Sequence, residues 1–174
     1  LGLSVEDVDK LTGPVLGRPK SATFRTCDVV GLDTLVHVAR GVHEHCPKDE
    51  ARNVFAIPSF IQHMVDQQWL GDKTKQGFYK KIKNEKGDSI ILSLNLQTLE
   101  YGEQKKSKFP TLEATKAIDS LSQRMPMLYN GSDKAGEFYK KAFAGLFAYV
   151  SNRIPEISSS VHSIDAAMRA GFGW

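Results

Sequence analysis

The sequence predicts a mostly α-helical fold that contains one β-hairpin. Apolar residues recur at helical spacing through most of the 174 residues. Between about residues 77 and 94 the pattern changes to an alternation of apolar and polar residues around a turn, which is typical of a hairpin. Strands and helices do not alternate anywhere in the pattern, so we do not expect a dinucleotide-binding sheet.

The first predicted helix begins after Ser4, which has the spacing of a capping box to Asp7. Gly13-Pro14 ends this helix. Residues 16–34 then begin as a loop, and their apolar side chains are expected to be buried. Those side chains are Phe24, Val29, Val30 and Leu32.

Two clearer helices follow. One runs from Leu32 to about His45, and Pro47 stops it. The other starts near Pro58, because proline suits the first turn of a helix. Gly71 is expected to end this second helix.

The hairpin comes next, with its solvated tip at about residues 83–88. A polar connector is expected at 102–110 and a helix at 112–125. A long helix then starts at about Lys134, and Pro155 kinks or ends it. Helical character resumes after Pro155.

The stretch GDKTKQGFYKK, residues 71–81, raises the question of a phosphate-binding loop. Such a loop needs a preceding strand, a GK[ST] ending and a following helix, and this stretch has none of them. It instead predicts a basic turn that leads into a strand. Lys73 and Lys75 either meet a phosphate or are solvated.

The remaining chemical patterns have simple structural interpretations. His43, His45 and Cys46 are too close in sequence to share a tetrahedral metal, so we expect no metal site. The acidic cluster at residues 6–9 either performs acid–base chemistry or is a solvated first turn. Asn152-Arg153 is either a buried hydrogen-bonded pair or a catalytic pair.

Composition adds bounds on function. The net charge of +3 is mild and scattered, so nucleic acid is not an expected partner. No apolar run is long enough for a membrane helix. Cys27 and Cys46 have no paired spacing and are expected to be small buried residues in a reducing cytoplasm. Leu1 is not Met and opens no leader pattern, so we expect a processed or excised piece.

Three motifs together resemble one family. They are VEDVDKLTGPVLGRPKSATFRTCDVVGLDT from Val5, LGDKTKQGFYKK from Leu70 and YVSNRIPEI from Tyr149. The chain resembles the C-terminal region of 3-hydroxyacyl-CoA dehydrogenases, especially the bacterial fatty-acid oxidation enzymes that are fused to a hydratase. The resemblance implies a helical C-terminal domain like that of 6-phosphogluconate dehydrogenase, with the one hairpin.

The resemblance also implies two copies of the helical domain. Residues 1–83 are then most of the first copy, residues 84–133 are the hairpin and connector with a helix, and residues 134–174 begin a truncated second copy. Packing of two copies would bury apolar side chains of the long helix, and its exposed part would allow self-association. These side chains are Phe138, Phe143, Leu146 and Phe147.

In such enzymes an upstream domain binds NAD, so this chain is not expected to bind NAD itself. The family's catalytic His, Glu and Asn lie upstream of Leu1, so we expect no catalytic residue here, and Asn152 does not inherit a role. The fragment alone is expected to be inactive.

The resemblance places the loop 18–24 at the cleft that holds the acyl-CoA substrate. The substrate-binding residues it implies are Arg18, Lys20, Ser21 and Phe24. The two cations suit the acidic CoA, but solvated loop cations would look the same. The alternative function is a free-standing helical module whose basic turn, Lys73–Lys86, binds an acidic partner or RNA.

Overall fold

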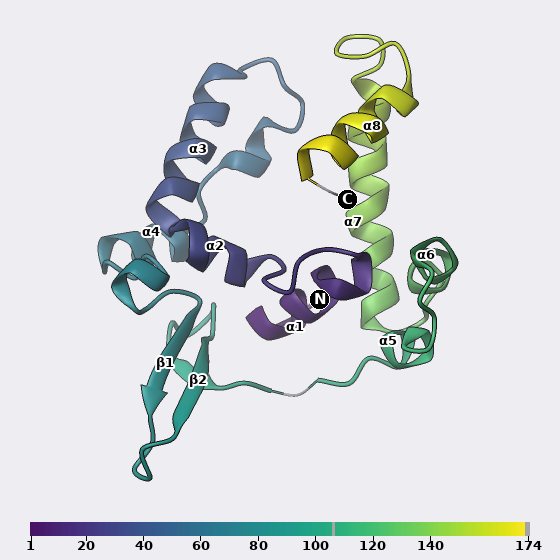
Figure 1. Cartoon of the computed structure of the whole chain (residues 1–174). Helices are drawn as coiled ribbons and strands as arrows, with labels where there is room; N and C mark the ends of the chain where they lie inside the picture. Colours follow the sequence, from purple (N-terminus) through teal and green to yellow (C-terminus); the bar gives the residue numbers. More distant parts are fainter. Residues whose placement is uncertain (106, 173–174) are drawn as a thin grey trace. The chain divides into compact units, whose positions relative to one another are not determined.

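The computed structural model describes residues 1–105 and 107–172. The predicted fold class is confirmed, because the chain is mostly helical with a small antiparallel sheet (Figure 1). The residues group into two compact units. The helix–sheet unit comprises Gly2–Lys10 and Ser21–Lys106. The helical unit comprises Leu1, Leu11–Lys20 and Ser107–Trp174, of which Gly173 and Trp174 lie outside the described residues.

The helix–sheet unit is built from four helices and three strands among its described residues. The last two residues of its first helix belong to the helical unit. Short 3-10 turns cover Arg52–Phe55 and Asp72–Thr74. The longer elements are α1 (Val5–Thr12), α2 (Phe24–Val30), α3 (Leu32–His45), α4 (Ser59–Asp66), β1 (Tyr79–Lys83), β2 (Ser89–Leu94) and β3 (Tyr101–Glu103).

The start of α1 follows from its local sequence. The Ser4 hydroxyl oxygen accepts the N–H of Asp7 at 3.2 Å, and the Asp7 carboxylate accepts the N–H of Ser4 at 3.1 Å. This reciprocal pair satisfies two amides that the first turn leaves open, and it confirms the predicted capping box. The predicted helix from Leu32 to His45 is also confirmed, as α3.

Three details differ from the prediction. The stretch after the first loop forms α2, and Val29 and Val30 are exposed by 59% and 53% rather than buried. The fourth helix ends at Asp66 rather than at Gly71, because Gln68 takes a positive φ of 59° and turns the chain. The polar connector also contributes a short third strand, β3.

The sheet has the strand order β1-β2-β3 and is antiparallel throughout. In its register Tyr79 pairs with Ser93, and Leu94 pairs with Tyr101. The strands bring apolar side chains onto the helices to make one core. The buried members of this core are Val5, Leu32, Val36, Ile61, Met64, Phe78 and Leu94.

The helical unit contains a 3-10 turn at Pro14–Leu16 and four further helices among its described residues. The predicted helix over 112–125 is in fact two helices, with a break between Thr115 and Leu121. In Figure 1, α5 and α6 lie beside the same end of α7, in contact with it. These helices are α5 (Pro110–Thr115), α6 (Leu121–Tyr129), α7 (Lys134–Asn152) and α8 (Val161–Phe172).

Only the first half of α7 is buried. Its N-cap Asp133 accepts the N–H of Gly136 at 3.1 Å, and the hydroxyl of buried Tyr139 donates to the carbonyl of Leu11 at 2.8 Å. The rings of Tyr139, Phe143 and Phe147 stack one turn apart. Phe147 is 59% exposed, so the expectation that this face is buried is wrong for the far half of the helix, where Leu146 is 41% exposed.

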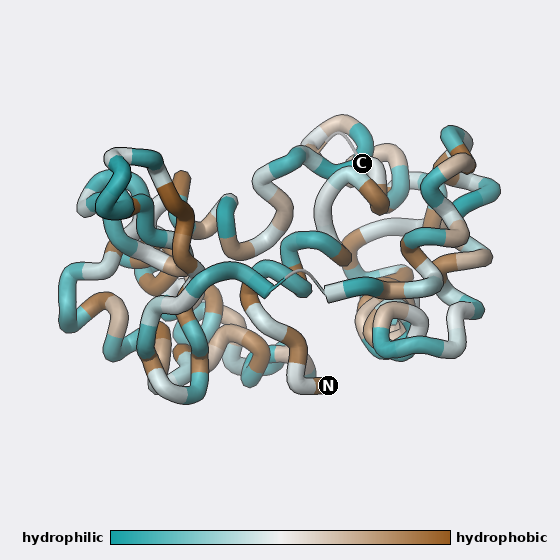
Figure 2. Tube along the Cα trace, turned by 90° about the horizontal axis from the view of Figure 1, so that it is seen from below, coloured by the Kyte–Doolittle hydropathy of each residue, from teal (hydrophilic) through white to brown (hydrophobic). Residues whose placement is uncertain are grey.

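Apolar and polar residues alternate in short stretches along the whole trace (Figure 2). Among residues 1–105 and 107–172, accordingly, none of the helices has both the length and the apolar character that crossing a bilayer requires.

Candidate functional site

The four predicted substrate-binding residues come from both units. Arg18 and Lys20 belong to the helical unit, and Ser21 and Phe24 belong to the helix–sheet unit. Arg18 is half-buried, its N–H donates to the carbonyl of Gly13 at 3.3 Å, and burial lowers the pKa of its guanidinium. Lys20 is exposed. Of these two cations, Arg18 is therefore partly covered and Lys20 is open to solvent.

The loop Ser21–Phe24 has a defined conformation. Ala22 sits at a φ of 52°, in the left-handed region. The Thr26 hydroxyl lies 2.7 Å from the Ala22 carbonyl, to which it donates, and 2.9 Å from the Ser21 hydroxyl. The Phe24 ring packs on the core ring of Phe78, with 4.5 Å between centroids. The loop is thus tied at both ends to ordered parts of its unit.

The strongest restraint on this loop is the carboxylate of Asp9. It accepts the backbone N–H groups of Thr23 at 3.0 Å, Phe24 at 2.6 Å and Arg25 at 3.0 Å. These are amides at the start of α2, where no helical carbonyl is available to them. The interpretation of the acidic cluster as a solvated first turn is therefore wrong for Asp9.

The same carboxylate also accepts the hydroxyl of Tyr79 from β1, at 2.8 Å. Burial and the neighbouring Asp9 charge raise the pKa of Tyr79, so the phenol keeps its proton at neutral pH and remains a donor. Two oxygens with four donors have no spare acceptor site of ordinary geometry. Asp9 therefore serves as an anchor and is not available as a general base.

A second carboxylate, Asp28, holds the start of β1. It is 1% exposed and accepts the N–H groups of Phe78 at 2.8 Å and Tyr79 at 2.9 Å. Burial raises its pKa to about 6, against the opposing effect of these two amides. This side chain fixes the strand that carries Tyr79.

Asp28 also explains the two glycines of the stretch 71–81. A Cβ on Gly77 would lie 2.0 Å from the Asp28 carboxylate, and one on Gly71 would lie 2.2 Å from the Asp28 carbonyl oxygen. Gly71 in addition has a φ of 100°. The glycines are thus required by close approach to Asp28, and not by a phosphate.

Two ion pairs cover the basic turn. Lys73 pairs with Asp33 at 2.5 Å, and Arg25 pairs with Asp72. All four side chains are about half-exposed, so each pair contributes little to stability. The pairing leaves Lys73 less suited to a phosphate than the sequence alone allowed.

The other candidates from the sequence have structural partners. The carbonyl of His43 accepts from Arg52, and a ring nitrogen of His45 lies 2.8 Å from the Gly41 carbonyl. Within the described residues no cluster of three or more His, Cys, Asp or Glu side chains is arranged to hold a metal. Cys46 is exposed, which differs from the expected buried residue.

Asn152 and Arg153 do not form the buried pair that was one of their two interpretations. Asn152 is exposed at the end of α7. Arg153 pairs with Glu156 at 2.8 Å and lies over the ring of Tyr149, with 5.3 Å from guanidinium to centroid. These contacts are all local and lie at the C-terminal end of α7.

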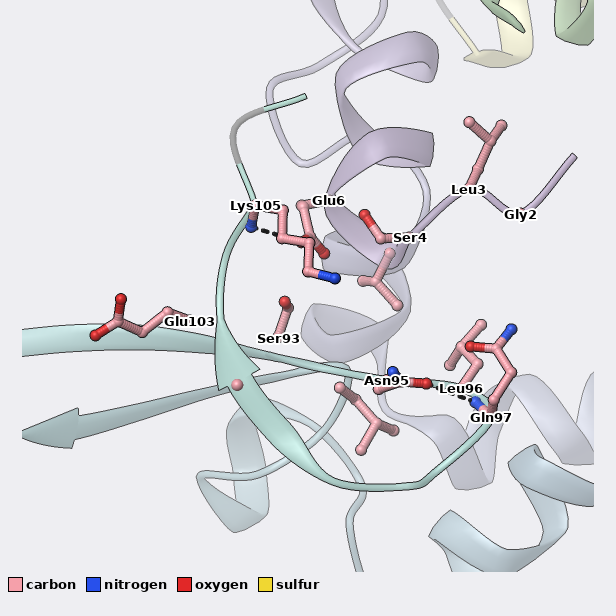
Figure 3. Close-up of a pocket in the computed structure, with 13 residues that line it drawn as sticks. Gly2, Leu3, Ser4, Glu6, Ser93, Asn95, Leu96, Gln97, Glu103 and Lys105 are labelled. Atoms are coloured by element: carbon pink, nitrogen blue, oxygen red, sulfur yellow. Dashed lines mark hydrogen bonds between the residues drawn. The ribbon is translucent and has the colours of Figure 1, made fainter. Parts of the chain in front are cut away.

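The helix–sheet unit contains a pocket of about 310 Å³. Figure 3 shows the residues that line it. Its walls are the residues just before and in the first turn of α1, together with the ends of β2 and β3 and the residues that follow these strands. One wall is closed by the Glu6 carboxylate, which accepts the N–H of Lys105 at 2.9 Å. None of the four predicted substrate-binding residues lines it.

Sequence reasoning missed Asp9, Asp28 and Tyr79 as the residues that organise the loop. The available signal was the pair of glycines at 71 and 77, whose spacing within a basic turn indicates a close approach by another group. Nothing local indicated that the approaching group is Asp28.

The loop Ser21–Phe24 lies within the part of the chain that matches a known protein family. Residues 2–81 match the family model described as 3-hydroxyacyl-CoA dehydrogenase, C-terminal domain. A probable 3-hydroxyacyl-CoA dehydrogenase of Bacillus subtilis is 46% identical over 99% of this chain and 21% of its own length. Another, of Deinococcus radiodurans, is 49% identical over 49% of this chain and 24% of its own length.

A putative fatty acid oxidation complex trifunctional enzyme of Rickettsia prowazekii is 21% identical over 99% of the chain and 22% of its own length. The chain thus spans about a fifth to a quarter of the length of these curated relatives. No solved structure gives a significant match to the chain.

Proposed function

Residues 2–81 belong to the C-terminal domain family of the 3-hydroxyacyl-CoA dehydrogenases, and from this premise we propose that the chain is the helical C-terminal part of an NAD-dependent 3-hydroxyacyl-CoA dehydrogenase of fatty-acid oxidation. The observation that carries the proposal is the 46% identity to a probable 3-hydroxyacyl-CoA dehydrogenase along 99% of the chain. Because the chain spans only 21% of that relative, oxidation of the substrate is assigned to a longer protein.

The described residues do not fit NAD. Their sheet is antiparallel in the order β1-β2-β3, and none of its strands runs through a glycine-rich turn into a helix. We therefore propose that a domain upstream of Leu1 binds the cofactor. The catalytic residues are proposed to belong to the same upstream part. On this account the 174-residue chain alone does not oxidise substrate.

The part proposed for this chain is to shape the acyl-CoA site. The loop Ser21–Phe24 is held by Asp9 in one conformation, as a substrate-facing wall requires. Arg18 and Lys20 supply positive charge for the CoA phosphates. Phe24, half-buried against Phe78, presents an apolar edge for the acyl chain.

We also propose that the chain contains two copies of the helical domain, with boundaries at 1–83, 84–133 and 134–174. The support is a shared start to α1 and α8. Each helix begins one residue after a serine, Ser4 or Ser160, whose hydroxyl accepts the N–H three residues on. Each carries an aspartate five residues after that serine, Asp9 and Asp165.

Self-association is proposed through the apolar face of the second copy. Leu146 and Phe147 on α7 are exposed by 41% and 59%, and Phe172 on α8 by 64%. A cytoplasmic location is proposed from the two free cysteines. The alternative of an RNA-binding or acidic-partner module is not favoured, because Lys73 of its basic turn pairs with Asp33.

The test compares the natural protein that contains this chain with the 174-residue chain alone. NAD reduction is followed with a series of 3-hydroxyacyl-CoA substrates. We expect turnover by the longer protein and none by the chain. NAD reduction by the chain alone, or its absence in the longer protein, would contradict the proposal. Arg18→Ala with Lys20→Ala should raise KM for the acyl-CoA and leave KM for NAD unchanged.

A further inference from the structure

The Asp9 carboxylate joins two segments that are far apart in the sequence. The amides of Thr23 and Phe24 donate to Oδ1, and the amide of Arg25 and the Tyr79 hydroxyl donate to Oδ2. Each oxygen therefore accepts two hydrogen bonds. We infer that Asp9 and Tyr79 are positioning residues for substrate binding, which fix the loop Ser21–Phe24 in the conformation that meets the acyl-CoA. This inference rests on the proposed function.

The arrangement differs from an ordinary helix cap. An N-cap side chain belongs to the residue just before the helix and moves with it. Here the N-cap residue Thr23 makes no side-chain cap, and the cap comes from Asp9, which is 14 residues earlier, on α1. The start of α2 is therefore held against α1. A movement of the loop together with α2 would have to break the hydrogen bonds to Asp9.

Tyr79 extends this restraint to the sheet. Its hydroxyl donates to Asp9, while its backbone N–H donates to Asp28 at 2.9 Å. The residue is also paired with Ser93 in the register of β1 and β2. The Tyr79 phenol therefore links the carboxylate that holds the loop to β1, and the Tyr79 backbone is fixed in turn by Asp28.

A consequence for substrate recognition follows from the same contacts. Free amides at a helix N-terminus are a common binding site for phosphate. The amides of Thr23, Phe24 and Arg25 at the start of α2 donate to Asp9, and the carboxylate adds a negative charge at that end. The α2 N-terminus is therefore not available to the CoA phosphates.

The test uses the natural protein that contains this chain and two substitutions. Tyr79→Phe removes one donor and leaves the three amides on Asp9. Asp9→Asn keeps the size of the side chain but places an NH2 group against backbone N–H donors. We expect KM for the acyl-CoA to rise roughly threefold in the first variant and by about tenfold or more in the second, with KM for NAD unchanged.

Tyr101→Phe is the matched control. It removes a hydroxyl of similar burial from the same sheet, but that hydroxyl donates to the carbonyl of Gly77 and does not reach the loop. We expect Tyr101→Phe to lower the melting temperature to a similar extent and to leave both KM values within about twofold of the wild type.

The outcomes separate the two proposals. A wild-type protein that does not oxidise 3-hydroxyacyl-CoA overturns the proposed function and this inference with it. An active wild type with an unchanged acyl-CoA KM in Tyr79→Phe overturns the inference alone. The inference is also overturned if Tyr79→Phe only loses kcat in proportion to its folded fraction, because that loss is the effect of lower stability. If Asp9→Asn does not fold, the comparison of Tyr79→Phe with Tyr101→Phe still decides.

Discussion

The helices α1 and α8 begin in the same way but differ in how well they are buried. Val5 and Val161 each follow a capping serine, yet Val5 is fully buried and Val161 is 46% exposed. Asp9 accepts four hydrogen bonds, whereas Asp165 is exposed. Local sequence therefore sets where such a helix starts, and it does not decide how the helix is buried.

The difference comes from what packs on each helix. Val5 belongs to a core cluster with residues of α3, α4 and β2. Asp9 accepts hydrogen bonds from the start of α2 and from Tyr79 of β1. By contrast, α8 has no buried residue among those described. A helix in a protein gains most of its stability from the segments that pack on its apolar face.

The largest expected effect is a charge placed on each helix start. Val5→Asp should destabilise the chain by more than about 3 kcal/mol, because it buries an unpaired carboxylate in the core. Val161→Asp should change the free energy of unfolding by less than about 0.5 kcal/mol. Urea unfolding of both variants measures the difference. Equal losses would mean that α8 is as buried as α1.

The next effect concerns pH and Asp28. Its pKa is raised from 3.8 to about 6 by burial, so the native state binds this proton more tightly than the unfolded state. The favourable contribution is full below 3.8 and is lost as pH rises through about 6. The loss is on the order of 3 kcal/mol.

The measurement is urea unfolding between these two pH values, with Asp28→Asn as the control. We expect the free energy of unfolding of the wild type to fall relative to that of the variant as pH rises. A difference that stays constant with pH would show that Asp28 is ionised throughout this range.

A smaller effect is expected from the two aspartates. Asp9→Ala leaves three amides at the start of α2 without their acceptor, and should cost about 2 kcal/mol. Asp165→Ala should cost a few tenths of a kcal/mol at most. Thermal unfolding of the pair checks this order, and a larger loss in Asp165→Ala would reverse the comparison.

The smallest effect is expected at the capping serines. Ser4→Ala removes one half of a reciprocal pair and should cost about 1 kcal/mol. In Ser160→Ala the bond lost is longer, 3.4 Å against 3.2 Å, and the helix is exposed, so the cost should be less than about 0.5 kcal/mol. Circular dichroism during thermal unfolding is sufficient to compare them.

The elements that could be predicted from the sequence are those with local signals. The helix from Leu32 to His45 has a regular apolar face and a proline shortly after its end, and its predicted bounds agree with the structure. By contrast α2 was missed, because its cap is Asp9, far away in the sequence. The three-residue strand β3 is too short to have a pattern.

In the candidate site, too, features with local sequence signals could be predicted and features that depend on distant segments could not. The loop Ser21–Phe24 was singled out through family resemblance, and its role in binding stays a proposal. Asp9, which holds this loop, and Asp28, which holds the start of β1, could not be predicted from the sequence. A buried carboxylate is identified by its donors, and these lie in distant segments. Only the glycines at 71 and 77 carried a sequence signal of that packing.

The anchoring of the loop Ser21–Phe24 by Asp9 can be tested by native-state amide hydrogen exchange on the 174-residue chain. We expect the amides of Thr23, Phe24 and Arg25 and those of α1 to exchange only through global unfolding, while those of α8 exchange many times faster through local opening. Rapid exchange at residues 23–25 would contradict the anchoring of the loop by Asp9. Equal protection of α1 and α8 would contradict the contrast between the two helices.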